Sequence, residues 1–377
     1  MAQVTGGAWV VEVVIDGRAI GGWSEYSVRT SMLDPADSFT LSRPFDRDAW
    51  DLCQTDRPIR ITINGVVFLT GFIDSGKISA KAGELQLAGR DKVGRLVQES
   101  APQISFDGLR LQAVIARVAS PWFEAVALSN TRNRRVVRGR GHKAAAADQV
   151  FVDVKAGTRL EPGQMRWAVI QDLADQVGAL VWSAGDGSEL VVGQPNYKQS
   201  PQYELRHYAP GAGKTSTVKD LTIEESTADR YSRIILLGAG AGTDANYGRP
   251  VTSRSGEVKD NPATADGEGL SFSAPKRLII ADHAVKSRQD AEGRVRREWN
   301  RRAMNAQIVS AVAEGHGQFR GGAYPTLFAT DTAAYVQDEE TGTQGLYHVV
   351  AVEFRCSRSS GAETTLTLLP RGTELAA

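Results

Sequence analysis

The chain has 377 residues, of which 41% are hydrophobic and 23% are charged, and its 44 basic residues balance its 44 acidic residues. A net charge of zero gives no whole-molecule attraction to nucleic acid or to an anionic membrane. Its two cysteines, Cys53 and Cys356, argue against a disulfide framework and a thiolate metal cluster, and we expect both to be buried.

The chain contains no apolar run of about 18 residues, the length that a membrane-spanning helix needs. The N-terminus lacks the basic and then apolar layout of a signal peptide. We therefore expect a protein that is made and folded in a reducing cytoplasm. The length predicts two to four domains, about one per 150 residues.

The N-terminal region reads as a series of short strands. Residues 8–31 predict a hairpin around Asp16-Gly17, and Asn64-Gly65 marks a second hairpin turn. Further alternating or apolar runs at 38–43, 59–63, 66–73 and 84–89 complete a meander. This many strands can form a small barrel or sandwich.

The pattern changes near residue 92. Helical spacing predicts helices over 92–100, 109–123 (ended by Pro121) and 165–177 (capped by Gly178). The sequence also predicts a strand at 151–157 and a hairpin around Gly185-Asp186-Gly187. Between them, 130–149 is basic and contains glycine, and we expect it to be a mobile loop.

Strand patterns return within 214–241, followed by a predicted long loop over 238–271 and a strand at 276–283. The longest predicted helix covers 286–306. One face repeats every four residues, with Ala291, Val295, Trp299 and Ala303. Three charge pairs at i,i+4 flank that face: Asp290–Arg294, Glu292–Arg296 and Glu298–Arg302.

The most informative pattern is a repeat. Residues 57–91 and 333–371 both read as an alternating strand, a turn, a longer apolar strand, another turn and an alternating strand that ends on arginine. In the last strand Leu85 and Leu87 correspond to Leu366 and Leu368, and Arg90 corresponds to Arg371. Two copies of a small antiparallel unit favour a duplicated barrel or sandwich over an enzyme with one site.

Two glycine-rich segments resemble nucleotide-binding loops only superficially. Residues 210–216, PGAGKTS, have Tyr208 where a phosphate loop needs glycine, and no helical pattern follows. Residues 238–242, GAGAG, follow a strand, but no helix pattern follows them either. A linker and a loop are the better interpretations.

No residue pattern predicts catalysis or metal binding. The five histidines, His142, His207, His283, His316 and His348, lack metal-site spacing, and we expect surface or interface positions for them. No nucleophile elbow occurs. The basic cluster Arg132, Arg134, Arg135, Arg138, Arg140 and Lys143 lacks the aromatic residues that stack on bases, which favours a solvated loop or an acidic protein partner over nucleic acid.

Four stretches, in this order, resemble the baseplate hub proteins of Mu-like contractile-tailed phages: 87–100, 167–195, 229–238 and 276–303. The resemblance implies two similar β-barrel domains with added α/β domains, arranged as a homotrimer in which six barrels form a pseudo-sixfold ring. It implies partners above (the tail tube protein) and below (the central spike protein). Other baseplate proteins and the tape measure protein are further candidate partners, and the genome would pass through the lumen without specific binding.

These observations predict a mainly β protein with α+β insertions: 1–98 as the first barrel, 99–205 as an α+β domain, 206–260 and 307–377 as the second barrel, and 261–306 as a strand-helix insertion. We expect a structural protein of the virion baseplate, assembled in the host cytoplasm, with no catalytic, cofactor or metal residues. The alternatives are a tail-associated glycan-binding protein and a peptidoglycan hydrolase. A contractile tail, a non-contractile tail and a tail-like bacteriocin particle all fit the sequence.

Overall fold

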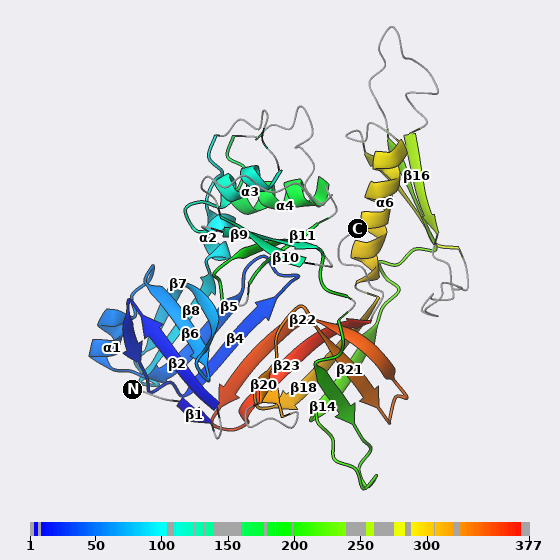
Figure 1. Cartoon of the computed structure of the whole chain (residues 1–377). Helices are drawn as coiled ribbons and strands as arrows, with labels where there is room; N and C mark the ends of the chain where they lie inside the picture. The colour runs from blue at the N-terminus through cyan, green and yellow to red at the C-terminus, as the bar shows by residue number, and fades with distance from the viewer. Residues whose placement is uncertain are drawn as a thin grey trace. The chain divides into compact units, whose positions relative to one another are not determined.

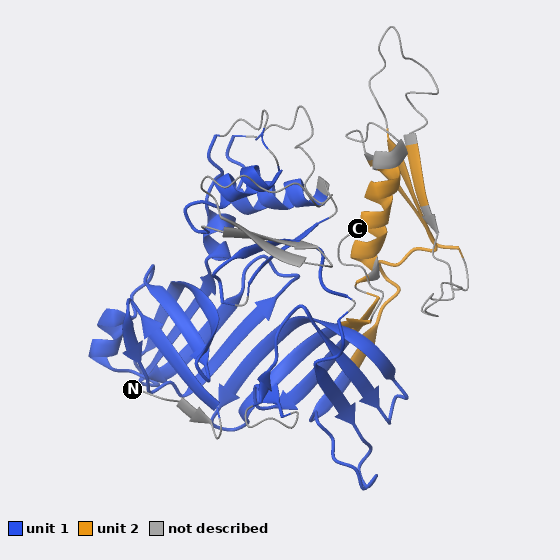
Figure 2. Cartoon of the chain, viewed as in Figure 1, with its two compact units in different colours: residues 1–222, 309–368 blue, residues 223–308, 369–377 orange. Residues whose placement is uncertain are grey.

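Figure 1 shows the computed structural model of the chain. The structure describes residues 4–6, 9–103, 109, 111–123, 125–130, 133–138, 160, 162–176, 179–184, 186–197, 199–238, 254–259, 275–282, 288–304, 306–319 and 325–370. These residues belong to two compact units, residues 1–222 with 309–368 and residues 223–308 with 369–377 (Figure 2). None of the described helices is both long enough and apolar enough to span a bilayer.

The largest sheet among the described residues has 14 strands, and its first half comes from the N-terminal region. This half contains β1 (Val4–Gly6), β2 (Trp9–Ile15), β3 (Arg18–Ile20), β4 (Glu25–Ser31), β5 (Ser38–Pro44), β6 (Pro58–Ile63), β7 (Val66–Ser79) and β8 (Glu84–Asp91). A short helix, α1 (Arg47–Leu52), connects β5 to β6. In β2 every second side chain is buried, as the alternating sequence predicts.

Both predicted hairpin turns are confirmed. Asp16 and Gly17 have φ of 49° and 78°, and Asn64 and Gly65 have φ of 49° and 79°. Two successive positive φ values are the geometry of the turn that matches strand twist, and asparagine, aspartate and glycine adopt it most readily. These turns set the pairing of β2 with β3 and of β6 with β7.

The second half of the large sheet comes from the C-terminal part of the chain. It contains β13 (Tyr203–His207), β14 (Asp220–Glu225), β18 (Gln307–Glu314), β21 (Thr332–Asp338), β22 (Gln344–Ser357) and β23 (Gly361–Pro370). A two-stranded ribbon, β19 (Gly317–Gln318) with β20 (Thr326–Leu327), lies between β18 and β21 in the chain.

The two halves repeat one strand order. The first reads β2-β6-β7-β8-β5-β4, and the second reads β13-β21-β22-β23-β18-β14. Strands in the same position also follow the same order along the chain. The halves differ at one end, since β2 is antiparallel to β6 whereas β13 is parallel to β21. The repeated meander predicted from the sequence is therefore confirmed and extends to six strands a copy.

The long strands of the two copies, β7 and β22, both have 14 residues. Leu85, Leu87, Leu366 and Leu368, which correspond in the sequence, are all buried. Arg371 lies outside the described residues. The prediction of a mainly β fold is confirmed, and a large antiparallel sheet is its principal element.

An α+β part joins the two halves in the chain and belongs to the first unit. It contains α2 (Val93–Gln98), α3 (Leu111–Ala119), α4 (Arg166–Gln176) and a sheet of order β10-β9-β12-β11. The strands are β9 (Ala125–Asn130), β10 (Asn133–Arg138), β11 (Leu180–Ser183) and β12 (Leu190–Gly193). The apolar faces of the helices meet in one core, with Val114, Ile115, Ile170 and Leu173 at most 1% exposed.

One prediction in this region is wrong. Residues 130–149 were expected to form a loop, but β10 lies within them and pairs antiparallel with β9. Val136 and Val137 lie opposite Ala127 and Val126 in this pair. The strand predicted at 151–157 lies outside the described residues.

The second unit packs one helix on a small sheet. The strands are β16 (Arg254–Lys259), β15 (Arg233–Gly238) and β17 (Arg277–Asp282), in that order, and the helix is α6 (Arg288–Ala303). Ile234, Leu236, Ala291 and Val295 form its core, and Trp299 packs against them, which confirms the predicted apolar face of the long helix for Ala291, Val295 and Trp299.

The predicted long loop over 238–271 is also wrong in part, because β16 lies inside it and pairs with β15. The sequence of β16 gave no alternating signal. Gly256 accounts for its position, since a Cβ there would lie 2.5 Å from the Ala291 backbone. A glycine is therefore required where this strand passes close to α6.

Candidate assembly surfaces

The two copies of the sheet are joined directly. Strand β4 of the first copy pairs antiparallel with β22 of the second, from Tyr26 opposite Cys356 to Ser31 opposite Ala351 (Figure 1). We call this contact the internal joint. Strand β21 pairs with residues 344–349 of β22 and β4 pairs with 351–356, so two strands share one long edge.

A polar cluster lies at the internal joint. The Ser27 hydroxyl donates to the Glu353 carboxylate at 2.7 Å, and the Arg355 guanidinium donates to the same carboxylate at 2.6 Å. Arg29 lies opposite Glu353 in the strand pair. Burial raises the pKa of Glu353, but the hydrogen bonds from Arg355 and Ser27 outweigh it and leave that pKa below its usual value.

A buried aromatic cluster around His316 lies beside the joint. The His316 ring contacts Trp9, Tyr26 and Phe354, with ring centroids 5.4, 5.8 and 5.1 Å away. Its Nε2 is 2.7 Å from the Tyr26 hydroxyl and its Nδ1 is 3.0 Å from the Thr364 hydroxyl. Trp9 and Tyr26 belong to the first copy, and Phe354 and Thr364 belong to the second. The His316 side chain therefore contacts both copies of the sheet.

The expectation that the histidines lie at the surface or an interface is wrong for His316 and His348, which are 0% and 5% exposed. The hydroxyl groups of Tyr26 and Thr364 replace water around the His316 ring, so burial leaves neither nitrogen unpaired. Burial lowers the pKa of both histidines to about 4. His207 is half-buried beside Asp338, and His142 and His283 lie outside the described residues.

Asp37 and Asp91 form a second buried polar pair. The Asp37 carboxylate accepts a hydrogen bond from the Ser31 N–H at 2.8 Å, and Asp91 accepts from the Val93 N–H at 3.1 Å. Burial raises the pKa of Asp91 to about 7, and burial together with the Asp91 charge raises that of Asp37. Both residues are at most 4% exposed. The carboxylate pair is therefore enclosed by the protein and is not open to a substrate.

The equivalent edge on β7 is open. Strand β6 pairs with β7 as far as Phe72, and the edge beyond it, over Asp74–Ser79, has no partner strand among the described residues. Strand β8 occupies only the opposite edge of this segment. Four of its six side chains are exposed, including Ile78 at 38%. The matching part of β22 instead pairs with β4, over residues 351–356.

Strand β14 is the second open edge. It occupies the place of β4 in the second copy, and in the described sheet it pairs only with β18. Its side chains alternate between exposed and half-buried, whereas β4 has four buried residues. Strand β14 is thus equivalent to β4, and β7 is equivalent to β22. Within the described sheet, β14 and β7 do not pair with each other as β4 and β22 do.

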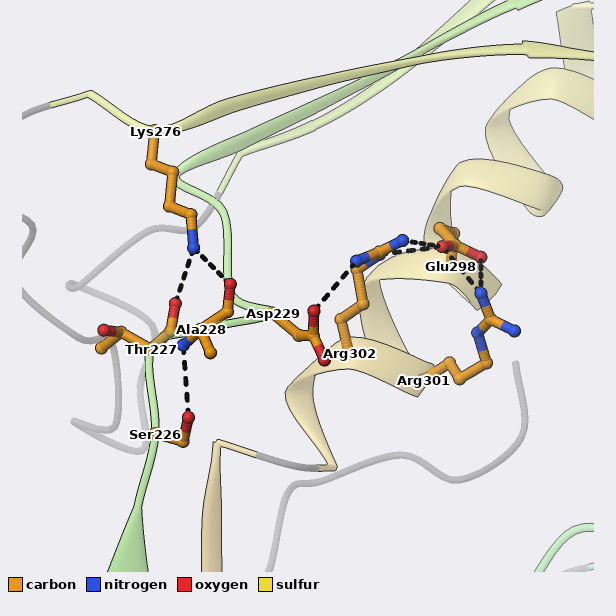
Figure 3. Close-up of polar contacts among 8 residues, drawn as sticks. All are labelled: Ser226, Thr227, Ala228, Asp229, Lys276, Glu298, Arg301 and Arg302. Atoms are coloured by element: carbon orange, nitrogen blue, oxygen red, sulfur yellow. Dashed lines mark hydrogen bonds and ion pairs between the residues drawn. The ribbon is translucent and has the colours of Figure 1, made fainter.

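A polar network fixes the chain where it leaves β14 (Figure 3). Lys276 donates to the carbonyls of Thr227, at 2.8 Å, and Ala228. Arg302 contacts Asp229 at 3.7 Å and Glu298 at 2.8 Å, the last being one of the predicted i,i+4 pairs. This network ties residues that follow β14 to α6 and β17 within the second unit.

Residues 210–216, the described glycine-rich segment, lack the helix that a phosphate loop needs. They form turns between β13 and β14. GAGAG lies outside the described residues apart from Gly238. No group of three or more potential metal ligands occurs in the part of the chain that the structure describes. Cys53 and Cys356 are buried and free, as predicted.

The sequence did not predict the internal joint. Its only signal was the repeat itself, since a duplicated unit must either join its copy or leave an edge open.

The first copy of the sheet matches a known domain. Residues 10–91, which span β2 to β8, match the family model described as Mu phage baseplate assembly protein GpP-like, N-terminal. This segment is similar to GpP-like N-terminal domains. No match is found among curated protein sequences.

Solved structures of tail proteins share the fold of the whole chain. The tail protein from Neisseria meningitidis MC58 has 21% identity and a TM-score of 0.75, covering 98% of each chain. The 43 kDa tail protein of prophage MuSo2 from Shewanella oneidensis has 18% identity and a TM-score of 0.72, covering 96% of this chain and 99% of that one. Prophage tail protein gp18 from Listeria monocytogenes EGD-e has 11% identity and a TM-score of 0.50, covering 95% and 94%. The predicted resemblance to Mu-like baseplate proteins is confirmed.

Proposed function

We propose that this protein is a structural component of the virion, the central hub of a phage tail baseplate. In this role three copies form a ring that joins the sixfold tail tube protein to the threefold central spike protein. The internal joint carries the proposal, because it joins two equivalent halves of the large sheet in one chain. Three such chains would present six equivalent halves around one axis.

The comparisons support the same role. The GpP-like domain coincides with one copy of the repeat, and the similar solved structures are tail proteins. A threefold assembly with internal repeats has a physical use, since it matches a sixfold partner on one side and a threefold partner on the other. Other baseplate proteins would bind the outer surfaces, and the α+β part is a candidate for those contacts.

Labelling of intact particles tests this function. A peptide tag inserted after Gly342, in the exposed turn between β21 and β22, should be detected by antibody at one end of the tail in electron micrographs of virions or tail-like particles. Label along the whole tube, or none on purified particles that retain activity, would contradict the hub role. Binding of purified protein to glycans, or turnover of cell wall, would instead support the two alternative functions.

A further inference from the structure

We propose that the sheet of the second unit binds an amphipathic helix of another protein, one that carries an acidic residue beside its apolar stripe. The helix would lie on the side of β16-β15-β17 that is turned away from α6, which we call the open face. The inference adds a binding partner to the proposed function, and it rests on that function only in placing the partner in the tail.

The strands of this sheet are apolar on both sides. On one side Ile234 and Leu236 pack against α6 in the core of the unit. On the open face Leu237 and Ile279 are 45% and 62% exposed. The two strands β15 and β17 are parallel and read RIILLG and RLIIAD. Near-continuous apolar runs are typical of parallel strands that are covered on both faces, so the open face is suited to a cover.

The size of the open face fits one helix. Ile235 lies opposite Ile279, and Leu237 lies opposite Ala281, so these four side chains form one apolar patch across β15 and β17. A sheet of three strands is about 10 Å across. The diameter of a helix with its side chains is also about 10 Å. A single helix would therefore cover the open face as α6 covers the other one.

One end of the open face carries an unbalanced positive charge. Arg277 begins β17 on the same side as Ile279, is exposed, and forms no ion pair within the described part of the chain. Arg233 lies opposite Arg277, but its guanidinium donates to the Glu257 carboxylate at 2.8 Å. A carboxylate on the bound helix would balance the charge of Arg277 and orient that helix along the patch.

The neighbouring segments of this chain do not offer such a helix. Residues 239–253 and 260–274 flank β16 in the sequence. Pro250 interrupts the first segment, and Gly267 with Gly269 interrupts the second, and both residue types disfavour a helix interior. A second copy of the open face would bring the same positive charge. A different protein with a carboxylate is the better occupant.

Photo-cross-linking in purified tail particles tests the proposal. Ile279→p-benzoylphenylalanine places a photoreactive group on the open face, and mass spectrometry identifies the linked peptide after irradiation. We expect a peptide of another tail protein with apolar residues at every third or fourth position and a nearby aspartate or glutamate. Phe319 is 61% exposed in the first unit, and the same group at that position is the control, which should not link to this peptide.

Charge reversal tests the acidic contact separately. With the photoreactive group at Leu237, Arg277→Glu should lower the yield of the link at least about tenfold. The isolated variant should keep the parent's melting temperature, because the Arg277 side chain is exposed.

Three results would overturn the proposal: links only to this chain, links to a segment without the apolar and acidic pattern, or no link in particles that contain the protein. The hub function is decided separately, by the position of the tag after Gly342.

Discussion

His316 shows how a single side chain can couple the two copies of a duplicated sheet. It contacts Trp9 and Tyr26 from one copy and Phe354 and Thr364 from the other, and it is fully buried. Neutral imidazole can accept one hydrogen bond and donate another, which suits two hydroxyl partners. Protonation would add a charge in a site that excludes water.

The free energy of unfolding should therefore fall with acidification. Burial lowers the pKa of His316 from its ordinary value of 6.5 to about 4, so the unfolded chain binds a proton between these values that the folded chain does not. His316→Gln should be less stable than the parent at pH 7.5, but should lose about 2 kcal/mol less on transfer to pH 5. Urea unfolding at both pH values measures this difference, and equal losses would contradict it.

Asp91 should act in the opposite direction. Its pKa is raised to about 7 by burial, so the folded protein binds a proton that the unfolded chain releases above about 4. The cost of ionising Asp91 is present above pH 7 and is relieved as the pH falls. Asp91→Asn removes this cost, and the variant should gain more stability relative to the parent at pH 8 than at pH 5. Urea unfolding of the parent and of Asp91→Asn at pH 8 and pH 5 measures this difference, and a larger gain at pH 5 would contradict it.

At the scale of elements, the internal joint is the contact on which the first unit depends. Phe354 is fully buried within it and packs against Phe68 with ring centroids 4.6 Å apart. Phe354→Ala should lower the free energy of unfolding by about 3–5 kcal/mol, the usual cost of such a cavity. Ile78→Ala, on the open edge of β7, is the matched control.

In dilute, monomeric protein, Ile78→Ala should change the free energy of unfolding by less than about 0.5 kcal/mol. Thermal and urea unfolding of both variants make the comparison. A similar loss in the two variants would show that the open edge is packed within the chain, and would count against the distinction between closed and open edges.

The sequence predicted most elements because their signals are local. The Asp16-Gly17 and Asn64-Gly65 turns, the alternation in β2 and the spacing of Ala291 and Val295 each need only neighbouring residues. Strands β10 and β16 were missed because tertiary contacts stabilise them: a partner strand for the arginine-rich β10, and close approach to α6 for Gly256.

The candidate surfaces were harder to predict than the strands. Pairing of β4 with β22 joins residues more than 300 positions apart, and nothing in either segment marks the other as its partner. The burial of His316 depends on the same long-range pairing, so its sequence neighbours could not reveal it. The repeat of Leu85 and Leu87 as Leu366 and Leu368 was the one indication that the two regions are equivalent.

At the scale of the whole molecule, duplication explains why one chain has a closed joint and two open edges. An exposed strand edge normally risks uncontrolled association, and proteins limit that risk by covering the edge or placing charge on it. Here Lys77 and Glu224 place opposite charges on the two edges.

The mass of the purified protein in solution, by light scattering over a range of micromolar to submillimolar concentrations, tests the assembly most directly. We expect a species of three times the chain mass of 40.6 kDa that resists dilution better in low salt than in high salt. A mass equal to one chain at every concentration, or an open-ended series of larger species, would contradict a closed ring of three copies.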